Sequence, residues 1–227
     1  MDLPPPGRMV RQMVLERMSV VVVTTRPELG DLSTRGVSRQ MEPDDADGGS
    51  AAPVSADGYF LTADHVLARM EGKNVFVVYN RGGGLLNEKA RVVWRSSEAD
   101  LALLHIPART PYFYRWSAPG SWIPEGAPIV HGGISTGPRS PVGKMGTPIP
   151  PDKPWGRSHR FKIDIPLEPG DSGRPVVNGH GALVGINSAV EFLVPLETAF
   201  FVESEGNRPN VRMIENLINR DRSRNGR

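Results

Sequence analysis

The sequence predicts an all-β protein, a sandwich or a pair of barrels, with one α-helix at the C-terminal end. First, 25 glycines and 22 prolines in 227 residues favour many turns, and therefore short strands over long helices. Second, short β-branched and apolar runs alternate with turn residues along most of the chain. Third, helical spacing is sustained only at the end, at Val211, Ile214, Leu217 and Ile218, with Pro209 near the helix start.

Short strands are predicted throughout the first half of the chain. The run after residue 18 is β-branched, and Asp57-Gly58 between two extended runs is a strong hairpin signal. The strands predicted in this half are 19–25, 59–62, 74–80, 89–94 and 101–106. Residues 8–18 could form one or two helical turns.

The second half is predicted to contain further strands and a long loop before the helix. Asn178-Gly179 signals a hairpin, and residues 135–158 are rich in Gly, Pro and Ser, as is typical of a loop. The strands predicted here are 129–133, 160–165, 176–177, 182–186, 192–195 and 200–202. The basic tail, 220–227, is expected to fray.

Composition limits the partners and the compartment. A net charge of +2 gives little drive toward nucleic acid, and the absence of cysteine excludes disulfides and cysteine-based sites. No apolar run approaches the roughly 20 residues of a membrane helix. The run at 20–23 is too short for the apolar part of a secretory signal, about 7–15 residues. We therefore expect a cytoplasmic protein with no nucleic acid, membrane, metal or cofactor, although a chain whose signal had been removed would look the same.

An acidic cluster lies in the polar stretch 26–47, at Glu42, Asp44, Asp45 and Asp47. A solvated surface loop is the simpler interpretation of such a charge run. A flexible element near the functional site that selects basic partners is the alternative.

The stretch Gly170-Asp171-Ser172-Gly173 has the composition of a site for a serine nucleophile. Glycines permit backbone conformations that other residues resist, so the hydroxyl can project from a tight turn. Neighbouring backbone N–H groups can then point at a common spot and form an oxyanion hole. Alone, however, such a cluster is more often an ordinary turn.

Two other segments supply a base and an acid. His65 ends the strand predicted at 59–62, and Asp100 opens the strand predicted at 101–106. A lone histidine is more often structural, and Asp100 could be a strand-edge carboxylate. Together with Ser172, however, they occur in the order His, Asp, Ser, which is the chymotrypsin order and not that of subtilisin or the α/β-hydrolases.

Four stretches in this order resemble the chymotrypsin-like (trypsin-fold) serine proteases. They look closest to the bacterial high-temperature-requirement-type protease domain, without a PDZ domain. The matching stretches are 57–66, 100–104, 162–177 and 183–189, within a resemblance that covers roughly 19–202. The resemblance implies two six-stranded antiparallel β-barrels and an endopeptidase acting on polypeptides. The expected divisions are a lead at 1–18, an N-terminal barrel at 19–110, a C-terminal barrel at 111–206, and a helix with tail at 207–227.

The resemblance also implies the roles of individual residues. Ser172 would be the nucleophile, His65 the general base and Asp100 the residue that orients it, with the backbone N–H groups of Gly170 and Ser172 forming the oxyanion hole. Substrate contacts are expected at the pocket base and along the pairing strand, at Pro166, Ser188, Ala189 and Val190.

Departures from the family pattern suggest what is particular to this chain. Pro166 at the pocket base is not the carboxylate that would bind Arg or Lys, and Val190 would narrow the pocket. We therefore expect small or medium apolar residues before the cut. Arg174 replaces the usual second glycine and could present a bulky cation on the leaving-group side. Asp171 replaces the usual Asn of the high-temperature-requirement branch, but no activation sequence is visible, so N-terminal activation is not expected.

Three other functions remain open at this point. A non-catalytic binding or scaffold protein could use the same fold, because fold does not fix function. A protease that cuts only its own precursor is a second alternative. An esterase of the α/β-hydrolase type is disfavoured by the order of the three residues. The oligomeric state, natural substrate and regulation are not predicted.

Overall fold

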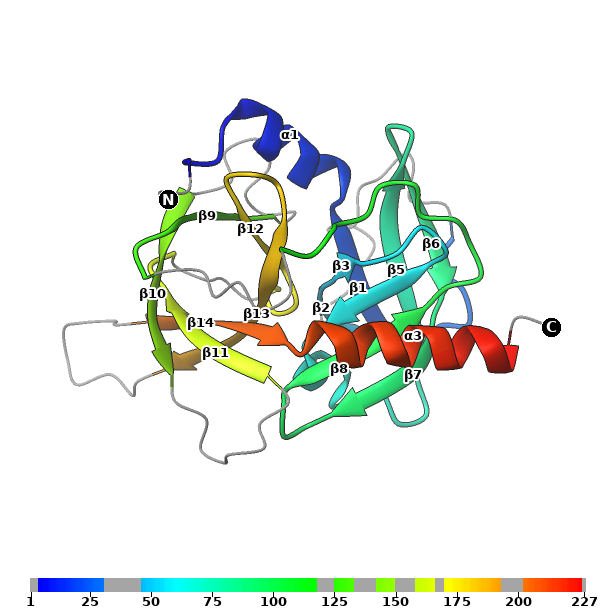
Figure 1. Cartoon of the computed structure of the whole chain (residues 1–227). Helices are drawn as coiled ribbons and strands as arrows, with labels where there is room; N and C mark the ends of the chain where they lie inside the picture. Colours follow the sequence, from blue (N-terminus) through cyan, green and yellow to red (C-terminus); the bar gives the residue numbers. More distant parts are fainter. Residues whose placement is uncertain are drawn as a thin grey trace.

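The computed structural model describes residues 4–30, 46–117, 125–132, 142–149, 158–165, 170–192 and 202–225 (Figure 1). At 46, 149, 189–192 and 202–203 it describes the backbone alone. Two β-sheet halves lie side by side, and a C-terminal helix runs from one half along the other. No helix among the described residues is long and apolar enough to span a membrane.

The N-terminal half begins with helix α1 (Arg8–Glu16) and strand β1 (Ser19–Thr24). Four consecutive valines make β1 a strand that is buried on both faces, and it pairs antiparallel with β2 and β5. The resulting sheet has the order β2-β1-β5-β6, with β2 at Ala46–Ser50, β5 at Asn74–Arg81 and β6 at Gly84–Lys89.

A second sheet of the same half has the order β3-β4-β8-β7. Its strands are β3 (Ala52–Pro53), β4 (Tyr59–Thr62), β7 (Arg91–Ser96) and β8 (Leu101–His105). The apolar strand β8 runs through the centre of the core, where Leu101 to Leu104 have no exposed surface. A short 3₁₀ helix, η1 (Asp64–Leu67), follows β4.

Two bent strands join these sheets into a six-stranded arrangement. Strand β2 continues into β3 through Ala51, and β6 continues into β7 through Ala90. Pairing persists at both bends, because Ala51 N donates to Ser19 O at 3.1 Å and Ala90 N to Val75 O at 2.8 Å. If each bent strand is counted once, six strands of the described chain follow one another around this half.

The C-terminal half is a closed barrel with the strand order β10-β11-β14-β13-β12-β9. Its strands are β9 (Pro128–His131), β10 (Val142–Ile149), β11 (Ser158–Ile163), β12 (Pro175–Asn178), β13 (Leu183–Phe192) and β14 (Val202–Pro209). Its interior is filled by apolar side chains that include Ile129, Met145, Phe161 and Val184. Closure pairs every strand on both sides and so removes the exposed edges of an open sheet.

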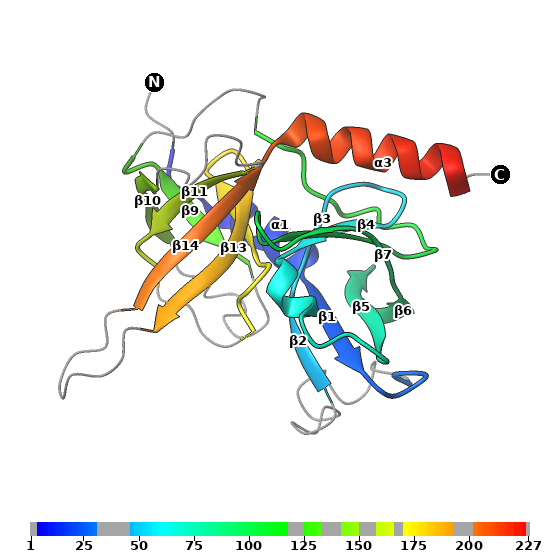
Figure 2. The ribbon, with the colours of Figure 1, turned by 90° about the horizontal axis from the view of Figure 1, so that it is seen from below.

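Helix α3 (Val211–Asn225) starts directly after β14 and packs against the N-terminal half (Figure 2). Asn210 caps it, because its Oδ1 accepts a hydrogen bond from Met213 N at 3.2 Å. Near its end, Asp221 accepts hydrogen bonds from the Tyr59 hydroxyl, at 2.9 Å, and from both terminal nitrogens of Arg91. The tail predicted to fray from residue 220 is therefore helical through Asn225, because this network holds it.

The predicted fold class, all-β with a C-terminal helix, is confirmed. The loop predicted at 135–158 is wrong in part, since β10 occupies 142–149. Its Gly and Pro residues suggested a loop, but Met145 faces the barrel core and Gly143 lies against Ile165. The strand at 192–195 lies almost wholly outside the described residues, as do 200 and 201. The domain boundaries stay a prediction.

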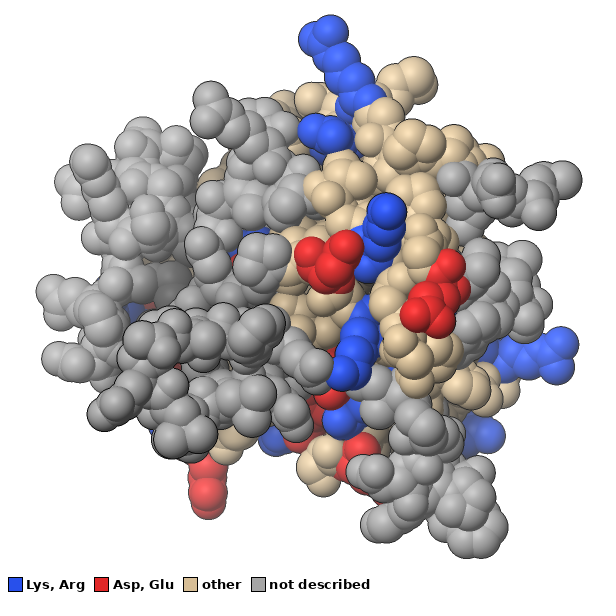
Figure 3. All heavy atoms as spheres, turned by 90° about the vertical axis from the view of Figure 1, so that its left-hand side faces the viewer, with Lys and Arg blue, Asp and Glu red and all other residues tan. Residues whose placement is uncertain are grey.

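Charges of both signs lie next to each other on the described part of one face of the molecule (Figure 3). Of the acidic cluster noted in the sequence, only Asp47 is described. Its carboxylate contacts Lys73 Nζ at 3.0 Å and Arg69 at 3.6 Å, so at least this member is paired at the surface of the N-terminal half.

Candidate active site

Ser172 lies in a tight turn that enters strand β12. Gly173 has φ +87°, and a Cβ on it would collide with Ser50 O and Thr62 Oγ1, so only glycine fits there. Gly173 N donates to Asn187 O at 2.8 Å, which ties the turn to β13. From the other half, Ser50 N donates to Ser172 O at 2.7 Å. The serine is therefore held between the two halves.

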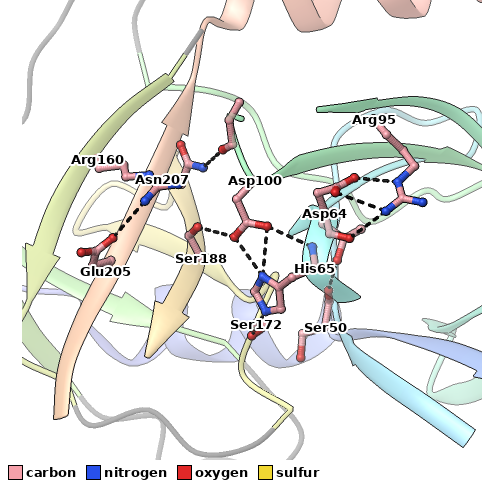
Figure 4. Close-up of polar contacts among 12 residues, drawn as sticks. Ser50, Asp64, His65, Arg95, Asp100, Arg160, Ser172, Ser188, Glu205 and Asn207 are labelled. Atoms are coloured by element: carbon pink, nitrogen blue, oxygen red, sulfur yellow. Dashed lines mark hydrogen bonds and ion pairs between the residues drawn. The ribbon is translucent and has the colours of Figure 1, made fainter. Parts of the chain in front are cut away.

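His65 reaches Ser172 from the 3₁₀ helix η1. Its Nε2 lies 2.7 Å from Ser172 Oγ, and its Nδ1 lies 3.0 and 2.9 Å from the two carboxylate oxygens of Asp100 (Figure 4). The imidazole is about half exposed, whereas the Asp100 side chain is 14% exposed. The structure thus brings all three predicted residues into one hydrogen-bonded series.

Asp100 occupies a turn between β7 and β8, where it has φ +48°. Aspartate tolerates this left-handed conformation better than most residues. Its carboxylate also accepts hydrogen bonds from His65 N at 3.0 Å and from Ser188 Oγ at 2.6 Å. The preceding carbonyl, Ala99 O, accepts a hydrogen bond from Asn207 Nδ2 of β14, so the C-terminal barrel holds this turn as well.

The electrostatics of the pair favour a charged acid and a basic imidazole. The hydrogen bond that His65 donates to Asp100 raises the pKa of His65 above its usual 6.5, against the effect of burial. Burial by itself raises the pKa of Asp100, but the hydrogen bonds from His65 and Ser188 outweigh it and hold that pKa below its usual value. Since an ionised carboxylate only accepts, neutral His65 carries its proton on Nδ1 and Nε2 accepts from the Ser172 hydroxyl.

The predicted oxyanion-hole donors lie on the same turn. Gly170 has φ +96°, and its carbonyl accepts a hydrogen bond from Ser50 Oγ at 2.8 Å. No described residue accepts a hydrogen bond from the backbone N–H group of Gly170 or Ser172. Both are therefore available to a bound group.

The predicted substrate contacts are only partly described. Pro166 lies outside the described residues. Ala189 and Val190 lie in β13 and pair with Glu205 and Ser204 of β14, but their side chains are not described. Ser188 is fully buried, and its hydroxyl donates to Asp100.

Arg174 does not occupy the position expected for it. It is 2% exposed, and its Nη2 lies 2.5 Å from Asp171 Oδ1. The expectation of a bulky cation on the leaving-group side is therefore wrong, because the guanidinium is buried against the carboxylate three residues earlier.

The sequence reasoning missed a second ion pair beside the site. Arg95 of β7 holds Asp64, the residue before His65, with Nε 2.6 Å from Oδ1 and Nη2 3.2 Å from Oδ2 (Figure 4). Asp64 was visible in the motif, but nothing in the sequence indicated its partner. Among the described residues, no group of His, Asp or Glu could hold a metal ion.

Two β-barrels with Ser, His and Asp hydrogen-bonded in series between them are the arrangement of the trypsin-fold serine peptidases. The chain belongs to the trypsin-like peptidase domain family, whose pattern matches residues 49–186. The predicted class, a peptidase domain of the trypsin fold, is thereby confirmed.

The chain is similar in sequence to several curated serine proteases. The chain is 29% identical over 175 residues to a "Probable periplasmic serine endoprotease DegP-like" of Pseudomonas fluorescens, covering 69% of this chain and 34% of that protein. It is 31% identical over 181 residues to a protein of the same description from Marinomonas sp., with coverages of 68% and 34%. It is 28% identical over 173 residues to "Putative serine protease HhoB" of Synechocystis sp., with 70% and 40%. The chain thus spans about a third of the length of such relatives.

Solved structures show the same fold. Deg5 has a TM-score of 0.63 at 16% identity, covering 91% of this chain and 90% of that one. The HtrA-type protease AlgW with a tripeptide has a TM-score of 0.63 at 21% identity, covering 92% and 62%. The predicted resemblance to the high-temperature-requirement type is confirmed.

The expected cytoplasmic location is contradicted by these comparisons, because the DegP-like relatives are described as periplasmic. The expectation depended on the short apolar run at 20–23. That run is part of the buried strand β1, so its length carries no information about targeting.

Proposed function

We propose that this chain hydrolyses peptide bonds through an acyl-enzyme formed on Ser172. The observation that carries the proposal is the hydrogen bond between His65 Nε2 and Ser172 Oγ, 2.7 Å long, with Asp100 on the opposite ring nitrogen. A serine is activated when a base accepts its proton and a third group orients that base.

In the proposed reaction Ser172 Oγ attacks the substrate carbonyl carbon while its proton moves to His65 Nε2. Asp100 stabilises the imidazolium and stays ionised. The tetrahedral intermediate collapses to the acyl-enzyme when His65 gives the proton to the leaving amine. Water then attacks the acyl-enzyme while His65 accepts its proton, and His65 returns that proton to Ser172 Oγ as the carboxylic acid is released. The Gly170 and Ser172 N–H groups stabilise the oxyanion, each by about 3–4 kcal/mol.

The substrate of this reaction is a polypeptide, by likeness to the DegP-like relatives described as endoproteases. We infer from Pro166 and Val190 that small or medium apolar residues precede the cut. By the same likeness, the periplasm is the compartment we infer. A peptide-library profile tests the preference, which efficient cleavage after Arg or Lys would contradict.

The decisive experiment is labelling with a fluorophosphonate, which reacts with activated serines. The wild-type chain should be labelled at Ser172 and should cleave a peptide library, whereas Ser172→Ala and His65→Ala should do neither. A folded wild-type chain that is neither labelled nor active would favour a non-catalytic binding protein. Labelling with cleavage only of the chain's own terminus, seen by intact mass, would favour a self-processing protease.

A further inference from the structure

Asp171 and Arg174 form a buried ion pair on either side of Ser172 and Gly173. The side chains of Asp171 and Arg174 are 2% and 3% exposed, and Arg174 Nη2 lies 2.5 Å from Asp171 Oδ1. A buried carboxylate is strongly unfavourable unless a cation or several hydrogen bonds compensate it. The buried Asp171 carboxylate therefore needs compensation, and Arg174 provides a cation for it directly beside the nucleophile.

The same four residues are closed by a backbone hydrogen bond. Arg174 N donates to Asp171 O at 3.0 Å, which leaves Ser172 and Gly173 at the corner of the turn. Arg174 is itself fixed, because its carbonyl accepts a hydrogen bond from Asn187 N of β13 at 2.8 Å. Its side chain therefore extends from a backbone position that β13 anchors, just before β12, back to the residue that precedes the serine.

The neighbouring peptide groups are held from the opposite direction. Ser50 Oγ donates to Gly170 O at 2.8 Å, and Ser50 N donates to Ser172 O at 2.7 Å. Asp171 lies between these two anchored residues. The direction of its side chain therefore constrains the Asp171–Ser172 peptide, which carries the Ser172 N–H group.

His131 is the other titratable group described near this pair. It is 1% exposed, and its Nδ1 lies 3.2 Å from Asn187 Nδ2. Burial, and then the charge of Arg174, lower the pKa of His131 to about 4. The histidine is therefore neutral at ordinary pH and does not substitute for the Arg174 charge.

We infer that Arg174 is a positioning residue for the nucleophile turn, whose buried charge orients Asp171 and so sets the Ser172 hydroxyl and the Ser172 N–H group. This inference depends on the proposed peptidase function. It follows that the turn contains its own counter-ion and needs no amine released by cleavage of the chain. A guanidinium suits this role because it is planar and always charged.

The test compares Arg174→Met, Asp171→Asn and the double variant, with kcat, KM and the rate of fluorophosphonate labelling as readouts. Each single change removes the charge that faces the remaining buried one, so the turn should reorient. We expect kcat and the labelling rate to fall by about 10²-fold, with KM within about twofold. The double variant removes both charges and should recover at least tenfold over either single variant. Arg174→Lys should lie between Arg174→Met and wild type.

The matched control is Arg91→Met, which removes an ion pair with Asp221 far from the nucleophile turn. It should lower the melting temperature and leave kcat unchanged. If Arg174→Met does not fold, the inference is tested by comparing kcat and the labelling rate of Asp171→Asn with those of the double variant.

Three results would overturn the inference while leaving the peptidase function intact. The first is that Arg174→Met keeps the wild-type kcat. The second is that the double variant is no more active than either single variant. The third is that only chains shown by intact mass to be shortened at the N-terminus are active. If wild type is neither labelled nor active, the proposed function itself fails and the inference fails with it.

Discussion

The Arg95 guanidinium holds the carboxylate of Asp64, with Nε 2.6 Å from Oδ1, and Asp64 immediately precedes His65. Arg95 Nη2 also lies 3.4 Å from the Asp64 carbonyl oxygen. Strand β7 thereby fixes the first residue of η1, from which the imidazole extends. The pair also places two opposite charges near His65, and each can be removed separately.

The pH dependence of activity should respond to this pair with opposite signs. The pKa of His65 is raised chiefly by the hydrogen bond with Asp100, and the charge of Asp64 contributes to the rise. Because His65 must be neutral to accept a proton, wild-type kcat/KM should rise with pH through a pKa above 6.5. Asp64→Asn removes a negative charge and should move this limb to lower pH. Arg95→Met leaves Asp64 uncompensated and should move it to higher pH.

Profiles of kcat/KM from pH 5 to 9, measured below the melting temperature of every variant, check the two directions. Arg222→Met is a suitable control, because Arg222 lies near the end of α3 and pairs with Asp57, in the turn before β4. Shifts of the same sign in both Asp64 and Arg95 variants would contradict an electrostatic effect and indicate a displaced turn.

Asp100→Asn should abolish most of the peptidase activity while the protein stays folded. The amide has nearly the same shape but offers N–H donors to the ring nitrogen, so His65 would carry its proton on Nε2 and could not accept from Ser172. We expect kcat to fall by about 10⁴-fold with little change in KM. Single-turnover kinetics with an ester substrate measure it. A loss below tenfold would exclude Asp100 from the orienting role.

Gly173→Ala should cost both stability and activity. A left-handed alanine costs about 1–2 kcal/mol wherever it occurs. At Gly173 the new methyl would also collide with Ser50 O, so the turn must move. Gly82→Ala is the matched control, because Gly82 has φ +64° and open space around its Cβ. Chemical denaturation should show a larger loss for Gly173→Ala, and only this variant should lose kcat; equal losses would contradict the packing argument.

The ion pair between Asp57 and Arg222 should stabilise the protein only above acidic pH. The hydrogen bond from Arg222 lowers the pKa of Asp57 from 3.8 to about 2. A lowered carboxyl pKa stabilises the fold above the unfolded value, and this contribution is lost as pH falls from about 4 toward 2. Both side chains are nearly half exposed, so we expect about 0.2–1 kcal/mol.

Asp57→Asn should therefore lower the melting temperature at pH 7 by about 0.4–4 °C, at about 2–4 °C per kcal/mol for this size. The difference from wild type should shrink steadily below pH 4. A difference that stays constant down to pH 2 would assign the effect to something other than ionisation.

The three residues of the hydrogen-bonded series were predictable because each lies in a short local motif whose order along the chain is informative. Their partners were not, because the contacts join distant segments. Ser50 lies 120 residues from Gly170, and nothing in either segment indicates that they meet. The burial of the Arg174 side chain could not be predicted either. The sequence shows that Arg174 lies two residues after Ser172, but not whether its side chain is exposed or buried. Strand β10 was missed because its Gly and Pro residues are typical of a loop and only Met145 among its described side chains is buried.

Helix α3 affects how fast the two halves that carry the site meet, because it connects them. The helix is covalently continuous with β14 of one half and is bound through Asp221 to Tyr59 and Arg91 of the other. If the halves separate, this connection keeps them at a high effective concentration, so they meet again without diffusing through solution. The approach of His65 to Ser172 is thus an intramolecular encounter that recurs at a rate set by the tether and not by the amount of protein.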